Sequence, residues 1–179
     1  MAMRLNQTLF VACLSLLAVF ALNAADQTNA PVAPTGSFQI RNQKFGDLLR
    51  PKDASGAEGA RIVLYPAEPW KCMTWRLKPV SNSVCQVQNH FTSKTFTVKS
   101  GSEGKDVTQT AWAREADLRP QWRFTLLPDG SYIICDAKTD EALTARESGG
   151  TVGIVLAPWK DQAEQKWKLE PIDPAKLTM

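Results

Sequence analysis

Histidine is rare in this 179-residue sequence, whereas tryptophan is unusually frequent. The single histidine, His90, excludes multi-histidine metal sites and argues against a serine–histidine–aspartate triad. Six tryptophans accompany only two tyrosines. Because an aromatic ring can stack on the C–H face of a sugar or anchor a protein interface, these residues point to binding chemistry.

Catalytic motifs are equally scarce. The sequence contains no P-loop, no glycine-rich nucleotide fingerprint and no serine elbow. Glycoside hydrolysis needs two carboxyl groups that face each other across a cleft. The nearest pairs, Glu115/Asp117 and Asp161/Glu164, lie in expected loops with nothing to hold them in that arrangement. We therefore predict a protein that is not an enzyme and that carries no metal and no cofactor.

Three of the tryptophans mark an internal repeat. Trp75, Trp122 and Trp167 each begin a similar segment, and they lie 47 and 45 residues apart. Three further columns share this period: Ile40/Val87/Ile134, Asn42/Asn89/Asp136 and Leu49/Phe96/Leu143. A period of this length indicates a repeat architecture. The units predicted from it are residues 37–80, 83–128 and 131–172.

Each unit has the pattern of four short β-strands, because β-branched residues and period-two alternation recur between turn-forming segments. The expected strands are 38–40, 48–49, 61–65, 74–77, 84–87, 95–98, 107–112, 121–126, 132–135, 142–145, 151–156 and 166–169. Closure of such a structure removes exposed strand edges. We predict an all-β fold with threefold pseudo-symmetry, in which the three repeat tryptophans anchor a shared core and Asn89 and Asp136 cap turns.

The residues around these tryptophans carry a family resemblance. Gln165-Lys166-Trp167 is a QxW motif, and the related segments are Pro120-Gln121-Trp122 and Met73-Thr74-Trp75. Over about residues 37–172 the chain resembles the ricin B-type (QxW) β-trefoil lectins, although only the third unit keeps the full motif. The resemblance implies a β-trefoil fold and non-catalytic carbohydrate binding.

The resemblance also implies one shallow sugar site in each unit. Such a site combines an acidic residue after the second-strand apolar position, an aromatic residue ten positions before the QxW tryptophan, and polar residues just before that tryptophan. The acidic position holds Arg50, Thr97 and Thr144; the aromatic position holds Tyr65, Trp112 and Ala157; the polar pair is Cys72/Met73, Arg119/Pro120 and Glu164/Gln165. No unit keeps all of these features.

The carbohydrate-binding candidates are therefore drawn from all three units. They are Trp112, Thr97, Arg119, Tyr65, Thr144, Glu164 and Gln165, with the second and third units favoured. The expected partner is a carbohydrate, a glycoprotein or a glycolipid. Lysine and arginine exceed aspartate and glutamate by only 21 to 18, too small an excess to hold a nucleic acid.

An alternative is a protein-binding trefoil whose sugar sites have decayed, either a protease inhibitor or a non-catalytic subunit of a secreted toxin assembly. Trp70 and Trp159 lie outside the repeat columns, in loops that follow Pro69 and Pro158. Tryptophan is enriched at the energetic centres of protein interfaces. These two residues would be the anchors for such a partner.

The first residues have the pattern of an export signal. Arg4 precedes an apolar run over 9–22, which is shorter than the roughly 20 residues of a membrane span, and small residues follow it. We predict a signal peptide over 1–24, a flexible leader over 25–36 and a trefoil domain over 37–179, in a secreted or periplasmic protein. Three cysteines remain, an odd number whose disulfide pairing the sequence leaves open, and Cys85 is expected to be a small buried apolar residue.

Overall fold

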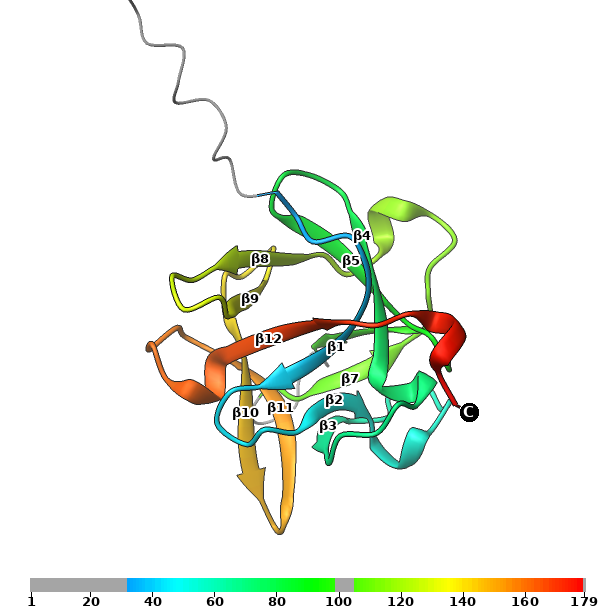
Figure 1. Cartoon of the computed structure of the whole chain (residues 1–179). Helices are drawn as coiled ribbons and strands as arrows, with labels where there is room; N and C mark the ends of the chain where they lie inside the picture. Colours follow the sequence, from blue (N-terminus) through cyan, green and yellow to red (C-terminus); the bar gives the residue numbers. More distant parts are fainter. Residues whose placement is uncertain (1–31, 99–104, 179) are drawn as a thin grey trace, which may run out of the picture.

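A computed structural model describes residues 32–98 and 105–178, so the predicted signal peptide lies outside the described residues. These residues form β-strands and short 3-10 helices (Figure 1). The strands are β1 Gly36–Asn42, β2 Leu48–Pro51, β3 Ile62–Tyr65, β4 Thr74–Pro79, β5 Val84–Asn89, β6 Thr95–Val98, β7 Val107–Thr110, β8 Trp122–Leu126, β9 Tyr132–Asp136, β10 Ala142–Ser148, β11 Thr151–Ala157 and β12 Lys166–Pro171. The 3-10 helices are η1 Lys52–Ala54, η2 Lys71–Met73, η3 Ala116–Leu118, η4 Ala163–Gln165 and η5 Pro174–Lys176.

Six strands close a barrel. The pairing order is β1, β12, β9, β8, β5 and β4, and β4 pairs with β1 to complete the ring. Figure 1 shows the first strand, β1, beside the last, β12, with Phe38 to Asn42 opposite Pro171 to Trp167. The barrel therefore takes the first and fourth strands of each repeat, as the predicted threefold symmetry requires.

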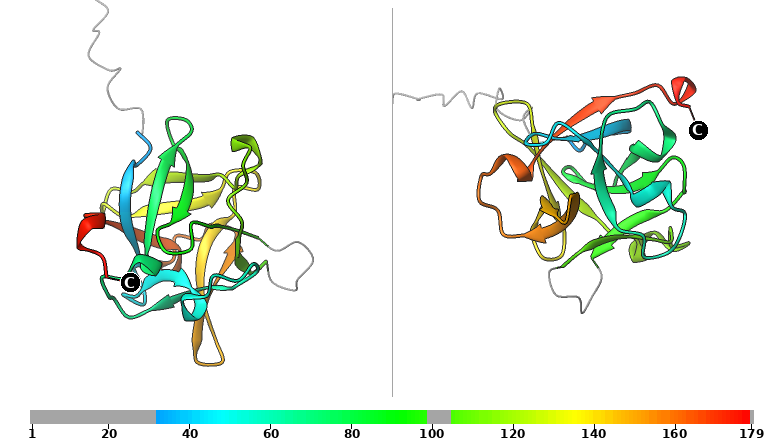
Figure 2. Two further views of the ribbon diagram at one scale, coloured as in Figure 1. Left: turned by 90° about the vertical axis from the view of Figure 1, so that its right-hand side faces the viewer. Right: turned by 90° about the horizontal axis from the view of Figure 1, so that it is seen from below.

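The remaining strands form three hairpins, β2–β3, β6–β7 and β10–β11, one from each repeat. Short bridges join them to one another at Gly153–Val63, Arg61–Thr108 and Asp106–Val155. The hairpin β10–β11 projects beyond the rest of the molecule, as the left view of Figure 2 shows. A six-stranded barrel with three hairpins is a β-trefoil, so the predicted fold class is confirmed.

The core is formed by the apolar residues that recur in the three repeats. Trp75, Trp122 and Trp167 are completely buried, and the ring of Phe96 lies 5.1 Å from that of Trp75 and 4.7 Å from that of Trp122. Cys85 is also completely buried, and burial raises the pKa of its thiol to about 11. Cys72, Cys85 and Cys135 are all free thiols. The predicted apolar role of Cys85 therefore agrees with the structure.

Two boundaries differ from the prediction: the start of the packed domain and the end of the expected strand 107–112. Ala33 belongs to the core and Gly36 opens β1, so the last residues of the predicted leader are packed against the domain. The expected strand 107–112 ends at Thr110, because the backbone N–H of Ala111 donates to the Glu58 carboxylate at 3.2 Å. Trp112 consequently lies in a loop.

Candidate functional site

The trefoil places equivalent residues of each repeat at equivalent points of the surface. Arg50, Thr97 and Thr144 lie in the second strand of their repeats. Tyr65 and Ala157 end the third strand, and Trp112 follows it. A loop with a 3-10 helix then leads into each fourth strand. The loop therefore lies where it can complete a site with the second and third strands.

Buried glutamines fix these loops. The Nε2 groups of Gln39 and Gln86, which are 47 residues apart, donate to the carbonyls of Glu68 and Ala116, each at 2.7 Å. In the third repeat the side chain of Gln165 holds the loop. Its Oε1 accepts from the backbone N–H of Lys160, while its Nε2 donates to the Pro158 carbonyl and the Thr144 hydroxyl. Gln165 is 1% exposed, so it positions the loop and does not present a free amide to a ligand. The 47-residue spacing of Gln39 and Gln86 equals the repeat period, although neither residue belongs to a QxW segment.

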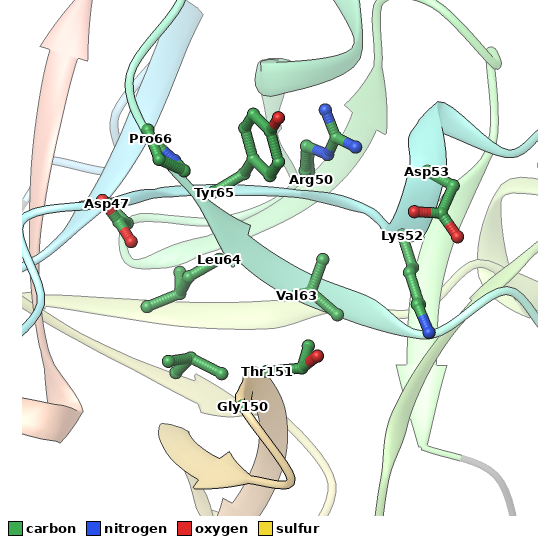
Figure 3. Close-up of a pocket in the computed structure, with 11 residues that line it drawn as sticks. Asp47, Arg50, Lys52, Asp53, Val63, Leu64, Tyr65, Pro66, Gly150 and Thr151 are labelled. Atoms are coloured by element: carbon green, nitrogen blue, oxygen red, sulfur yellow. The ribbon is translucent and has the colours of Figure 1, made fainter.

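In the first repeat a cation occupies the position of the expected acid. Arg50 is 6% exposed, and its guanidinium carbon lies 4.0 Å from the ring centre of Tyr65 and 5.9 Å from that of Trp70. Figure 3 shows Arg50 beside the Tyr65 ring. The adjoining pocket of about 340 Å³ is also lined by Asp47, Lys52 and Asp53. The Arg50 side chain thus lies over the Tyr65 ring, which remains 41% exposed.

In the second repeat two cations lie over the tryptophan ring. The Trp112 ring centre lies 4.8 Å from Lys78 Nζ and 4.6 Å from Arg119 Cζ. Arg119 is fixed in turn, because its guanidinium donates to the carbonyls of Ala113 and Arg114, both at 2.7 Å. Trp112 is half-buried, so part of its surface stays accessible. The structure brings Trp112 and Arg119 together as predicted and adds Lys78, which comes from the preceding repeat. Thr97 is half-buried and lies opposite Thr108 in the β6–β7 ladder.

The third repeat contains an open pocket at the predicted position. Thr144, Ala157 and Glu164 line it together, and its volume is about 490 Å³. The Glu164 carboxylate pairs with Lys44 at 2.6 Å, and this hydrogen bond lowers the pKa of Glu164. Glu141 and Lys105, which also line the pocket, form an ion pair. The pocket therefore offers carboxylate oxygens to sugar hydroxyls but lacks an aromatic ring.

The remaining aromatic and titratable candidates lie in loops, turns and short 3-10 helices. Trp70 and Trp159 are both half-buried. The ring nitrogen Nε2 of His90 lies 2.9 Å from the Ser37 hydroxyl, and burial together with Arg76 lowers the pKa of His90. Glu115 and Asp117 are exposed, while Asp161 pairs with Lys166. Within residues 32–98 and 105–178 no cluster of three metal-ligating side chains occurs, and no helix has the length and apolarity to span a membrane.

Comparison with solved structures identifies the fold class. The chain matches the designed threefold-symmetric protein ThreeFoil with a TM-score of 0.68 and 20% identity, over 76% of this chain and 99% of that one. It matches the ricin B-like lectin of Macrolepiota procera, solved with lactose, with a TM-score of 0.65 and 12% identity, over 79% and 99%. A mosquitocidal holotoxin matches with a TM-score of 0.69 and 15% identity over 79% of this chain, which spans only 18% of that toxin chain.

The fold is therefore a β-trefoil, as the QxW segments predicted, and a ricin B-like lectin is among the solved structures that share it. No protein-family model matches the sequence, and no curated protein matches it significantly. The similarity is one of fold, because all three identities are at or below 20%. The solved structures that share this fold include both a lectin and a toxin, so the fold alone does not assign a function.

Proposed function

We propose that this chain is an exported, non-catalytic protein that binds carbohydrate through shallow sites on its second and third repeats. The observation that carries the proposal is the third-repeat pocket, where Thr144, Ala157 and Glu164 line one hollow at the position expected for a sugar. A pocket of this kind supplies hydroxyl and carboxylate acceptors for paired hydrogen bonds with sugar hydroxyls. In the second repeat the accessible part of Trp112 supplies an apolar plate.

Binding to a broad saccharide panel, measured on an array and by isothermal titration calorimetry, tests this proposal. We expect affinities in the millimolar to micromolar range, because each site is shallow and buries little ligand surface. Free sugars and glycoproteins carrying the same terminal groups should bind alike. The absence of binding to any saccharide at millimolar concentration would refute the proposal.

Glu164→Gln should weaken binding at the third-repeat pocket about tenfold, because a hydrogen bond to a charged group contributes about 1.5–3 kcal/mol. Glu147→Gln is the matched control, since Glu147 is an exposed carboxylate at the end of β10 that does not line the pocket. Calorimetry with the best sugar from the panel gives both affinities. If the two variants bind the sugar with equal affinity, the sugar does not bind at the third-repeat pocket.

A protein-binding function is the second candidate, and one apolar pocket favours it. Trp70, Phe91, Cys72 and Ala54 line a pocket of about 120 Å³ with no polar surface, and Phe91 is 49% exposed. An exposed aromatic beside an apolar pocket is suited to anchor a protein partner. Capture of a partner from the native secretome that fails with Phe91→Ser would support this function, whether the partner is a protease or a toxin subunit. Retention of the partner by Phe91→Ser would contradict it.

A further inference from the structure

The outer face of the β4–β5 hairpin carries cations without carboxylate partners. Arg76 and Lys78 lie opposite Gln88 and Gln86 of β5, and Ser37 of β1 lies opposite Arg76 on its other side. Elsewhere in the described residues seven lysines and arginines form ion pairs, but within these residues neither Arg76 nor Lys78 has a carboxylate within 4.0 Å. These two cations are therefore free of ion pairs with the described residues.

Arg119 adds a third cation to the same place. Its guanidinium is held by two backbone carbonyls and lies over the Trp112 ring, on which Lys78 Nζ also lies. Burial lowers the pKa of Lys78, and the charges of Arg76 and Arg119 lower it further, which shows that the three cations share one region. We call Arg76, Lys78, Trp112 and Arg119 the cation–tryptophan surface.

The other two repeats differ in their charge balance. The first-repeat pocket is lined by the cations Arg50 and Lys52 and by the carboxylates Asp47 and Asp53. The third-repeat pocket combines Lys105 and Arg146 with Glu141 and Glu164. On the cation–tryptophan surface, by contrast, neither Arg76 nor Lys78 forms an ion pair with a described carboxylate.

We infer that the cation–tryptophan surface binds an acidic saccharide, an inference that rests on the proposed carbohydrate-binding function. A carboxylate or sulfate of the sugar would pair with Lys78 and Arg76, while the C–H face of the ring packs against Trp112. Such an anion relieves the mutual repulsion of the cations, and charge-assisted hydrogen bonds are roughly twice as strong as neutral ones. Because backbone carbonyls already hold Arg119 and Trp112 is already packed, little side-chain freedom is lost on binding.

The test compares three probes by isothermal titration calorimetry at low ionic strength. They are a heparin-derived sulfated hexasaccharide, an oligogalacturonate, which carries carboxylates, and neutral lactose. The wild-type chain should bind at least one acidic probe about tenfold or more tightly than lactose, and added salt should weaken that binding. Preference for the sulfated or the carboxylated probe identifies which anion the surface takes.

Variants locate the site. Lys78→Gln should weaken acidic-probe binding about tenfold and leave lactose binding at the third-repeat pocket unchanged, because Lys78 does not line that pocket. The Tm of Lys78→Gln should be no lower than that of the wild type, because the substitution relieves the repulsion among the three cations. Lys138→Gln, which neutralises an exposed lysine in the β9–β10 turn, is the matched control and should bind as the wild type does. Arg76→Gln should resemble Lys78→Gln.

Three outcomes would overturn the inference. Equal affinity for lactose and the acidic probes, or full acidic binding by Lys78→Gln, would refute it while leaving the proposed carbohydrate function intact. Equal binding of an oligothymidylate of matched charge would show that the surface recognises charge alone and not a saccharide. Failure to bind any saccharide would instead remove the proposed function itself.

Discussion

Replacing Asn89 with alanine should lower the free energy of unfolding by about 3 kcal/mol. Asn89 is 1% exposed, and its Nδ2 donates to the carbonyl of Cys72 at 2.9 Å. Its Oδ1 accepts from the backbone N–H groups of Phe91 and Thr92 at 3.0 and 3.1 Å. Alanine would leave the buried Cys72 carbonyl and two part-buried N–H groups without these partners, and a buried group left unpaired costs about 1–3 kcal/mol. Urea unfolding followed by tryptophan fluorescence measures the change.

The control for Asn89 is its counterpart in the third repeat. Asp136 is partly exposed, and its Oδ1 accepts from the backbone N–H groups of Lys138 and Thr139, both at 2.9 Å. Since water can replace these bonds at an exposed turn, Asp136→Ala should cost only about 1 kcal/mol. Equal losses in the two variants would contradict the assignment of the larger effect to burial.

Replacing each of the three repeat tryptophans with phenylalanine should lower the free energy of unfolding by different amounts. The indole N–H groups of Trp75 and Trp167 donate to the carbonyls of Leu49 and Leu143 at 2.9 and 3.0 Å. The indole N–H of Trp122 is buried and has no partner among the described residues. Phenylalanine at 75 or 167 leaves a buried carbonyl unpaired, so we expect a loss of about 3 kcal/mol, against about 1 kcal/mol at 122.

Thermal and urea unfolding of the three phenylalanine variants provide the comparison. The three variants serve as controls for one another. Each replaces an indole with a smaller phenyl ring at an equivalent core position, so the volume lost is the same. A Trp122→Phe variant as unstable as the other two would mean that ring volume alone sets the cost. We expect instead that the second repeat tolerates the change best.

The repeat columns predict the fold well because they are core positions. Large apolar side chains must recur wherever three equivalent units meet, so the spacing of Trp75, Trp122 and Trp167 specifies both the symmetry and the packing. Turn residues are predictable for a similar reason. Asn89 and Asp136 each accept two backbone N–H bonds at the start of a turn, as expected from their position in the repeat.

The candidate site is less predictable, because its properties depend on contacts between residues far apart in the chain. The sequence shows Arg50 at an acidic position, but only the fold places its guanidinium over Tyr65. Lys78 belongs to the first repeat, yet it lies over Trp112 of the second. Gln165 is part of the recognisable motif, and only its three internal hydrogen bonds reveal that it supports the loop.

The pairing of β1 with β12 has a consequence for biogenesis. Arg41 and Glu170 join these strands through hydrogen bonds of 2.6 and 2.7 Å across 129 residues of sequence. The barrel therefore cannot close until β12 is present, and such non-local closure is slow. In a chain translocated from its N-terminus, as we propose, this order delays closure of the barrel until β12 has crossed. A product truncated before β12 would leave two strand edges open to aggregation.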